Sequence, residues 1–348
     1  MLTLRTPKIY LSTFVLLLSS LACRAVTSLV IPNTPTPPPT PTSTFTPSPP
    51  PTLAVTTAVE VEQEAFCPVV LSDIMTAAGI LGETGAADKE RHLVTYTVTA
   101  EEISDPYYER VPANFKEEQE DTATHQQVWD YFTALIPAEQ REFVAEYSII
   151  TDGKDNILAA VMQTADDPTS WTLEVDTADT SDYYNLTFTL IHEFGHLLTL
   201  NADQVPPSNE VFNHPDDNGI HLQETSLCPN YFPGEGCSQA DSYINTFHQR
   251  FWTNIYDEWN RIDQIEDEDV YYGQLDEFYF RYRDQFVSDY AASHPAEDIA
   301  ESWSHFVFGP RPQGMTIAEQ KILFFYEYPE LTALREEILG NLCTAFPQ

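Results

Sequence analysis

The sequence predicts an α+β fold, in which a small N-terminal sheet is followed by a mainly helical C-terminal part. Residues 93–99 alternate Val and Tyr with Thr, which is the period of a half-buried strand. After Pro206 the apolar side chains instead recur every three or four residues, which is the period of a helix face. Because strands come first and helices follow, the two kinds of element are expected to segregate.

The first 23 residues have the layout of a bacterial export signal. Two basic residues precede an apolar run at residues 9–18, which is too short for a membrane-spanning helix, and small residues then lead to Cys23. The residues before Cys23 resemble a lipoprotein cleavage box, although Ser20 stands where leucine is usual. We expect Cys23 to carry a lipid that anchors the protein at the cell surface; ordinary signal cleavage and secretion is the alternative.

Residues 24–62 are predicted to form a linker. Between residues 32 and 52 nearly every residue is Pro, Thr or Ser, a composition that favours an extended polyproline-like chain over a packed core. Residues 63–348 have the composition of a globular domain, and no segment there is apolar enough to span a bilayer. We therefore expect one folded domain on a tether, in contact with the membrane only through the lipid.

The charge balance excludes one class of partner. The chain has 54 acidic residues against 16 Lys and Arg, and its formal net charge is -38. Such a surface repels phosphate backbones, so we expect no nucleic-acid partner. A solvated acidic exterior is the simplest interpretation of this charge, and steering of cationic substrates is a weaker one.

The cysteine count permits disulfides in an exported protein. The chain has five cysteines, so an even number remains if Cys23 carries the lipid. Three connectivities are open to the others. We favour Cys228–Cys237, which closes a short loop rich in Pro and Gly, and Cys67–Cys343, which ties the two ends of the domain together. Free or buried thiols are the alternative.

Strands and helices are predicted in turn between residues 93 and 200. Strands are expected at 93–99, 147–151, 157–164 and 171–176, and helices at 128–135, 138–145 and 183–200. Asp182 is the expected N-cap of the last helix. Further on, apolar residues at helical spacing are predicted to form core rather than a ligand site; they are Tyr243, Ile244, Phe247, Phe251, Ile255 and Trp259.

The segment from His192 to His196 matches the pattern H-E-x-x-H. On a helix the two histidines are four residues apart and share a face, so both imidazoles can bind one metal ion. Glu193 then projects beside the metal, where it can deprotonate a bound water. A helix with two packed or solvated histidines is the alternative. Gly195 lowers helix propensity by roughly 1 kcal/mol, so we expect a close packing partner on its face.

A catalytic zinc ion needs a third protein ligand and an open position. The metzincin extension of the motif is absent, because Thr199 and Ala202 occupy its glycine and histidine positions. Histidines downstream, at positions 214, 221 and 248, stand in no recognisable frame.

The segment after Pro295 offers a better third ligand. Pro295 suits the first turn of a helix, on which Glu297 and Glu301 are four residues apart and share a face. One carboxylate can bind the metal while the other accepts a hydrogen bond from a ligand imidazole. Two acidic residues on a solvated helix are the alternative.

An H-E-x-x-H motif followed by paired acidic residues on a later helix resembles the gluzincin metallopeptidases. The segment Ala296–Glu301 is similar to the A-E-x-x-A-E motif of the group that contains anthrax lethal factor and the Pro-Pro endopeptidases. This resemblance implies a zincin-like fold and Zn²⁺ as cofactor. It further implies Glu297 as ligand, Glu301 as partner of a ligand histidine, and Tyr290, seven residues before Glu297, as stabiliser of the transition state.

The resemblance covers the two motif regions and the strand before the first motif. The chain also resembles zinc-binding metallopeptidases of exported bacterial lipoproteins. The spacing of about a hundred residues between the motifs is longer than in lethal factor.

We therefore expect residues 63–348 to be a zinc endopeptidase domain that hydrolyses peptide or protein substrates outside the cytoplasm. A non-catalytic zinc-binding lipoprotein and a zinc hydrolase of non-peptide bonds are the alternatives. The strand at 171–176 is either an edge strand that an extended substrate could join or an ordinary core strand. Cleavage preference, oligomeric state and any bound calcium stay open.

Overall fold

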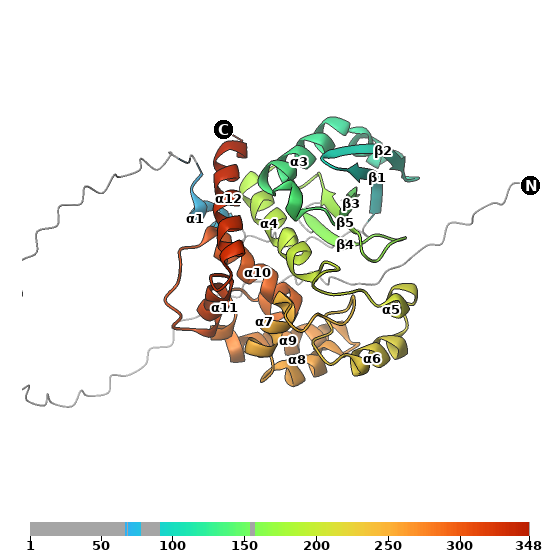
Figure 1. Ribbon diagram of the computed structural model, residues 1–348. Helices are drawn as coiled ribbons and strands as arrows, with labels where there is room; N and C mark the ends of the chain where they lie inside the picture. Colours follow the sequence, from blue (N-terminus) through green and yellow to red (C-terminus); the bar gives the residue numbers. More distant parts are fainter. Residues whose placement is uncertain (1–66, 68, 78–90, 154–156, 348) are drawn as a thin grey trace, which may run out of the picture. The chain divides into compact units, whose positions relative to one another are not determined.

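A computed structural model of the chain describes residues 67, 69–77, 91–153 and 157–347. Within these residues one five-stranded mixed sheet is combined with twelve α-helices, which confirms the α+β class (Figure 1). No helix in this described part has the length and apolar character needed to cross a bilayer. The predicted export signal, including Cys23, and the predicted linker at 24–62 lie outside the described residues.

The sheet is formed early in the chain and has the strand order β2-β1-β3-β5-β4. Its strands are β1 (Arg91–Thr99), β2 (Glu102–Tyr108), β3 (Val144–Thr151), β4 (Ala159–Gln163) and β5 (Trp171–Asp176). Strands β3 and β5 pair in parallel, whereas the other neighbours pair antiparallel. Strand β5 therefore lies inside the sheet, which corrects the edge-strand alternative for 171–176, and β4 is the edge on that side.

The predicted helix at 138–145 is wrong. A short 3₁₀ turn, η2, covers Ala138–Gln140, and β3 already begins at Val144. The helix stops because Arg141 turns inward: its side chain is buried and its Nε donates to the carbonyl of Ile136 at 3.1 Å. Arg141 accordingly has a backbone conformation outside the helical region, with φ -127° and ψ 20°, which ends the turn before Val144.

Strand β2 was not predicted from the sequence. It is an edge strand with mostly exposed residues, and it contains Asp105 at a φ of 47° followed by Pro106. Its pairing with β1 is interrupted by an irregularity between Thr95 and Thr97. Proline and a bulge are tolerated at a sheet edge, but both remove the alternation that marks a strand.

The helices fill the rest of the chain. They are α1 (Leu71–Ala77), α2 (Lys116–Glu120), α3 (Thr122–Leu135), α4 (Tyr183–Leu200), α5 (Asn209–Asn213), α6 (Asn218–Leu227), α7 (Tyr243–Phe251), α8 (Tyr256–Asp263), α9 (Glu268–Tyr282), α10 (Pro295–Phe308), α11 (Ile317–Phe325) and α12 (Pro329–Ala345). Helix α4 contacts β4 on one side and α10 on the other, and so joins the sheet to the C-terminal helices (Figure 1).

The predicted apolar face at 243–259 packs into the core. Five of its six members are buried, and Tyr243 packs against the same cluster. The face is divided between α7 and α8, because the chain turns between Trp252 and Ile255. Its aromatic side chains serve packing, as predicted.

Two disulfides close the described part of the chain. Cys67 is bonded to Cys343 and Cys228 to Cys237, which is the pairing that the sequence favours. The first spans a sequence separation of 276 residues, and the second spans 9. In the chain-entropy description the longer loop stabilises the folded state by on the order of 5 kcal/mol.

Candidate metal centre

Helix α4 carries the H-E-x-x-H residues. As predicted, Asp182 caps its start, where the side chain accepts a hydrogen bond from the backbone N–H of Tyr184 at 2.9 Å. At its end the Asn201 amide donates to the carbonyl of Leu197 at 2.7 Å. All residues from Leu190 to Leu200 are buried between the sheet and α10. The helix is therefore a rigid interior element, which suits a site that needs fixed side chains.

Helix α10 brings the second motif to α4. It begins at Pro295, and the His294 side chain accepts a hydrogen bond from the backbone N–H of Ala296 at 3.1 Å. The two helices meet at Gly195, where a Cβ atom would lie 3.1 Å from both Ala300 Cα and Trp303 Cδ1. Glycine is therefore used here for close approach, as its cost in helix propensity suggested.

The close approach at Gly195 predicts a measurable packing cost. In Gly195→Ala the new methyl group must push α10 away, so the usual gain in helix propensity is offset by overpacking of about 1–3 kcal/mol. Gly340→Ala on α12 is the matched control, since nothing lies within 4 Å of a Cβ there. Denaturant unfolding should show Gly340→Ala stabilised by about 0.5–1 kcal/mol and Gly195→Ala not. Equal stabilisation of both variants would contradict the close contact.

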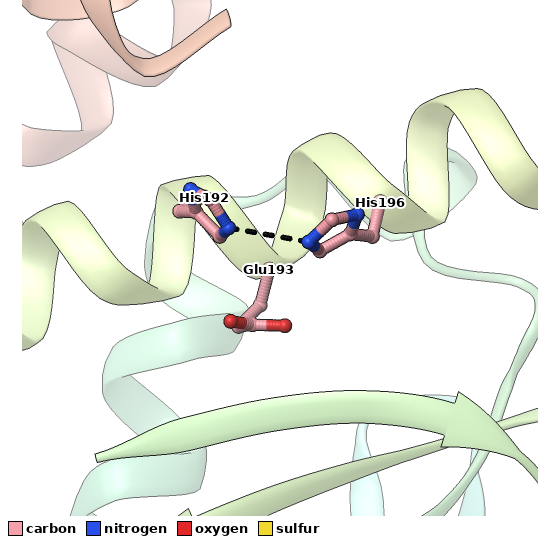
Figure 2. Close-up of side chains that lie close together, drawn as sticks. All are labelled: His192, Glu193 and His196. Carbon is pink, nitrogen blue, oxygen red and sulfur yellow. Dashed lines mark hydrogen bonds between the residues drawn. The ribbon is translucent and has the colours of Figure 1, made fainter. Parts of the chain in front are cut away.

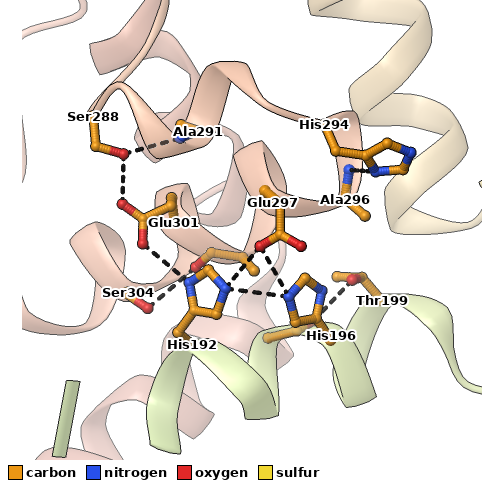
Figure 3. Close-up of polar contacts among 12 residues, drawn as sticks. His192, His196, Thr199, Ser288, Ala291, His294, Ala296, Glu297, Glu301 and Ser304 are labelled. Atoms are coloured by element: carbon orange, nitrogen blue, oxygen red, sulfur yellow. Dashed lines mark hydrogen bonds and ion pairs between the residues drawn. The ribbon is translucent and has the colours of Figure 1, made fainter. Parts of the chain in front are cut away.

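Three ligand atoms converge between the helices (Figure 3). The Oε2 atom of Glu297 lies 3.0 Å from His192 Nε2 and 3.3 Å from His196 Nε2. The two Nε2 atoms are 3.2 Å apart. All three residues are at most 7% exposed. The structure thus brings the predicted third ligand, about a hundred residues further along the chain, onto the two histidines.

These three atoms fit a zinc ion in chemistry and in spacing. Zinc in proteins takes imidazole nitrogen and carboxylate oxygen at about 2.0–2.1 Å in a tetrahedron, so neighbouring ligand atoms are about 3.3 Å apart. The observed separations of 3.0, 3.2 and 3.3 Å are those of one face of such a tetrahedron. The ligand set of two histidines and one carboxylate is also the composition of catalytic rather than structural zinc sites.

Glu301 fixes the orientation of the first histidine. Its Oε1 atom lies 3.0 Å from His192 Nδ1, so the ionised carboxylate accepts a hydrogen bond from the Nδ1–H group. In this tautomer the lone pair of the imidazole is on Nε2, which faces Glu297. Buried lone pairs that face one another require a cation between them. In the metal-free protein a proton on His192 takes the place of this cation. Burial opposes protonation, but the hydrogen bonds to Glu297 and Glu301 hold the pKa of His192 well above its ordinary value.

Glu193 leaves the same helix toward the sheet (Figure 2). A ligand atom of its carboxylate lies within 4.8 Å of those of His192 and His196. The backbone of Val161 in β4 lies close enough to this carboxylate to lower its pKa. Burial raises the pKa of Glu193 to about 7, although the neighbouring histidines oppose the rise. A carboxyl group with this pKa beside a metal site can exchange a proton near neutral pH.

Tyr290 lies at the first position of the 3₁₀ turn η4 (Tyr290–Ala292). Its ring centroid is 5.8 Å from that of His192. Burial, together with the charges of Glu297 and Glu193, raises the pKa of the phenol well above its ordinary value. The hydroxyl therefore stays protonated and can act as a hydrogen-bond donor next to the candidate ligands.

A buried ion pair behind Glu297 was missed in the sequence. The neighbouring Asp298 accepts hydrogen bonds from Lys321 Nζ at 2.5 Å and from Trp252 Nε1 at 2.7 Å. Asp298 and Lys321 are both 0% exposed, and the ammonium lies 4.1 Å from the Phe286 ring centroid. This pair ties α10 to α11 and to the end of α7. The available signal was a lysine within the apolar segment 317–325 of a chain that is poor in basic residues.

The remaining histidine candidates do not join the ligands. His214 and His221 are exposed, and His248 stacks on Tyr231 with ring centroids 4.1 Å apart. In the described part of the chain, the His, Cys, Asp and Glu side chains close enough to share a metal ion gather around His192 and His196, which lie near both Glu193 and Glu297. The geometry therefore points to the two motifs, and to none of these three histidines, as the candidate metal centre.

No family model, curated protein or solved structure matches this chain. Its functional interpretation therefore rests on the geometry of the two helices and on the chemistry of the side chains between them.

Proposed function

We propose that the protein is a zinc endopeptidase of the gluzincin type with a zincin-like arrangement of its active site. The contact of Glu297 with both imidazole Nε2 atoms is the observation that carries the proposal. A solvated acidic helix, the alternative for the second motif, would not leave Glu297 only 5% exposed and packed against two histidines.

The residues of the site divide the reaction between them. His192, His196 and Glu297 would hold the ion, which when bound supplies a Lewis acid and an acidified water. Glu193 accepts a proton from the attacking water and delivers it to the leaving amine. Tyr290 donates a hydrogen bond to the oxygen that gains negative charge in the transition state. Glu301 keeps His192 in the tautomer that offers its Nε2 lone pair.

Strand β4 is the proposed docking edge for the substrate. It is the sheet edge that contacts α4, and its Val161 backbone reaches Glu193. An extended peptide can add to such an edge through main-chain hydrogen bonds, which would carry it past Glu193. This position replaces 171–176, which is inside the sheet.

The two disulfides support an oxidising location outside the cytoplasm. A lipid at Cys23 and a surface location remain part of the proposal. Labelling with a radioactive fatty acid in the native host should mark the protein and should be lost in Cys23→Ala.

The proposal is tested by metal analysis combined with digestion of an unfolded protein such as casein. The purified chain should contain about one zinc ion per molecule, and a chelator should abolish digestion until zinc is restored. Stoichiometric zinc with no hydrolysis of casein or of a peptide library would instead indicate a non-catalytic zinc-binding protein. Hydrolysis confined to ester or amide substrates other than peptides would indicate a different zinc hydrolase.

Tyr290→Phe should lower kcat by about 10²-fold, because loss of one donor to a developing oxyanion has roughly this effect. Zinc content should not change, since the phenol is assigned to the transition state and not to the metal. Tyr107→Phe, at a side chain 66% exposed on β2, controls for a general effect of removing a hydroxyl. A wild-type rate in Tyr290→Phe would assign this tyrosine to packing.

A further inference from the structure

We propose that Ser288 is a positioning residue that couples the zinc-ligand side of the site to the tyrosine side. This inference rests on the proposed function and adds a residue to it. Ser288 is half-buried, belongs to neither motif and precedes the η4 turn that carries Tyr290. Its hydroxyl makes contacts in two directions (Figure 3).

The direction of both hydrogen bonds follows from their chemistry. The backbone N–H of Ala291 donates to Ser288 Oγ at 3.0 Å, because an amide nitrogen can only donate. The hydroxyl proton is then free to point at Glu301 Oε2, which lies 2.7 Å away. An ionised carboxylate accepts such a bond, and charge-assisted hydrogen bonds of this kind are about twice as strong as neutral ones.

The first arm runs from Ser288 to the metal ligand. Glu301 accepts a hydrogen bond from the Ser288 hydroxyl on Oε2, and its Oε1 lies 3.0 Å from His192 Nδ1. With both oxygens engaged, the carboxylate cannot rotate away from the imidazole. Ser288 thereby stabilises the His192 orientation in which Nε2 faces the metal position, one step further out than Glu301 itself.

The second arm runs from Ser288 to the oxyanion donor. The Ser288 hydroxyl oxygen accepts the hydrogen bond from the Ala291 amide. This bond closes the η4 turn, of which Tyr290 is the first residue. Asp289 supports the same turn independently, since its Oδ1 accepts from the Tyr290 backbone N–H at 2.9 Å. The Tyr290 and His192 rings in turn contact one another, tilted by 42° with 5.8 Å between their centroids.

A serine that only closed a turn would need just one of these contacts. The bond to Glu301 joins residues 13 positions apart and serves no local turn geometry. One hydroxyl therefore sets the distance between a histidine ligand and the tyrosine that acts on the substrate. Its loss should affect both metal affinity and turnover.

The test compares Ser288→Thr with Ser288→Val, two side chains of similar size of which only threonine keeps the hydroxyl. Zinc affinity is measured by competition with a chromogenic chelator, and hydrogen exchange at the Ala291 amide is measured in the metal-free protein. Ser288→Val should weaken zinc binding by about tenfold, by analogy with other partners of ligand side chains, and should speed exchange at Ala291. Ser288→Thr should retain wild-type values of both.

Asp289→Ala separates the two arms. It loosens the turn from the other side without touching Glu301, so it should lower kcat while zinc affinity stays at the wild-type value. In the Glu301→Gln variant, adding Ser288→Val should lower the zinc affinity little further, because both changes act through the same side chain.

Equal zinc affinities in the Val and Thr variants would overturn the coupling, even if the protein digests casein. If no peptide is hydrolysed but the Val and Thr variants still differ in zinc affinity, the peptidase proposal fails and the role of Ser288 at the metal stands. Absence of zinc binding in the unsubstituted protein would overturn both.

Discussion

Glu193→Gln is expected to retain zinc and to lower kcat/KM for peptide hydrolysis by about 10²–10⁴-fold. Glutamine keeps the shape of the side chain but cannot accept a proton from water. The three proposed ligand atoms belong to His192, His196 and Glu297, so the substitution at the buried Glu193 leaves them unchanged. Steady-state hydrolysis of an internally quenched peptide, with zinc content measured on the same sample, checks both parts.

The pH dependence of the unsubstituted protein gives a second check on Glu193. The base acts as a carboxylate, so hydrolysis should fall as the pH drops through its pKa. Burial raises this pKa to about 7 in the metal-free protein, and a nearby divalent cation lowers it. The acid limb of kcat/KM should therefore have its midpoint below about 7. Unchanged hydrolysis in Glu193→Gln would remove this residue as the base.

Glu297→Ala is expected to empty the metal site. Structural zinc sites with four ligands bind with about 10–16 kcal/mol, which is roughly 2.5–4 kcal/mol per ligand. Loss of one ligand should thus weaken zinc binding by at least about 10²-fold. Hydrolysis should be lost at limiting zinc, and part of it should return in excess zinc. Equilibrium dialysis against a buffered zinc series measures the change.

Glu336→Ala is the matched control for this variant. Glu336 is an exposed glutamate on α12, within a helix like Glu297 but away from the site. It should bind zinc as the unsubstituted chain does. Full zinc occupancy in Glu297→Ala at nanomolar free zinc would exclude this carboxylate as a ligand and, with it, the assignment as a gluzincin.

The parts of the site that follow helix periodicity could be predicted from the sequence. His192 and His196, and likewise Glu297 and Glu301, are four residues apart, so a helix alone places each pair on one face. The contacts of Ser288 with Glu301, and of Lys321 with Asp298, depend on how separate segments pack. No spacing rule describes such a contact, so these residues were not candidates.

The position of a strand within the sheet could not be predicted from the sequence either. In β5, Trp171, Leu173 and Val175 alternate with polar residues, which is the pattern of a strand with one solvated face. Both faces are nevertheless buried, because the polar face finds partners inside the protein. Asp176, for example, accepts hydrogen bonds from the backbone N–H groups of Asp152 and Ala178. Periodicity could therefore predict the strand but could not decide between edge and interior.

The bond between Cys67 and Cys343 has a mechanical consequence. A pull applied to the chain ahead of Cys67 passes through sulfur directly into α12, across a separation of 276 residues. Tension on that side would load the last helix and, through the hydrogen bonds of Arg335 to the carbonyls of Phe306 and Gly309, the C-terminal end of α10. Reduction of this one bond should instead send the load along the chain that follows Cys67 into α1, which contacts the helix that carries the two histidines.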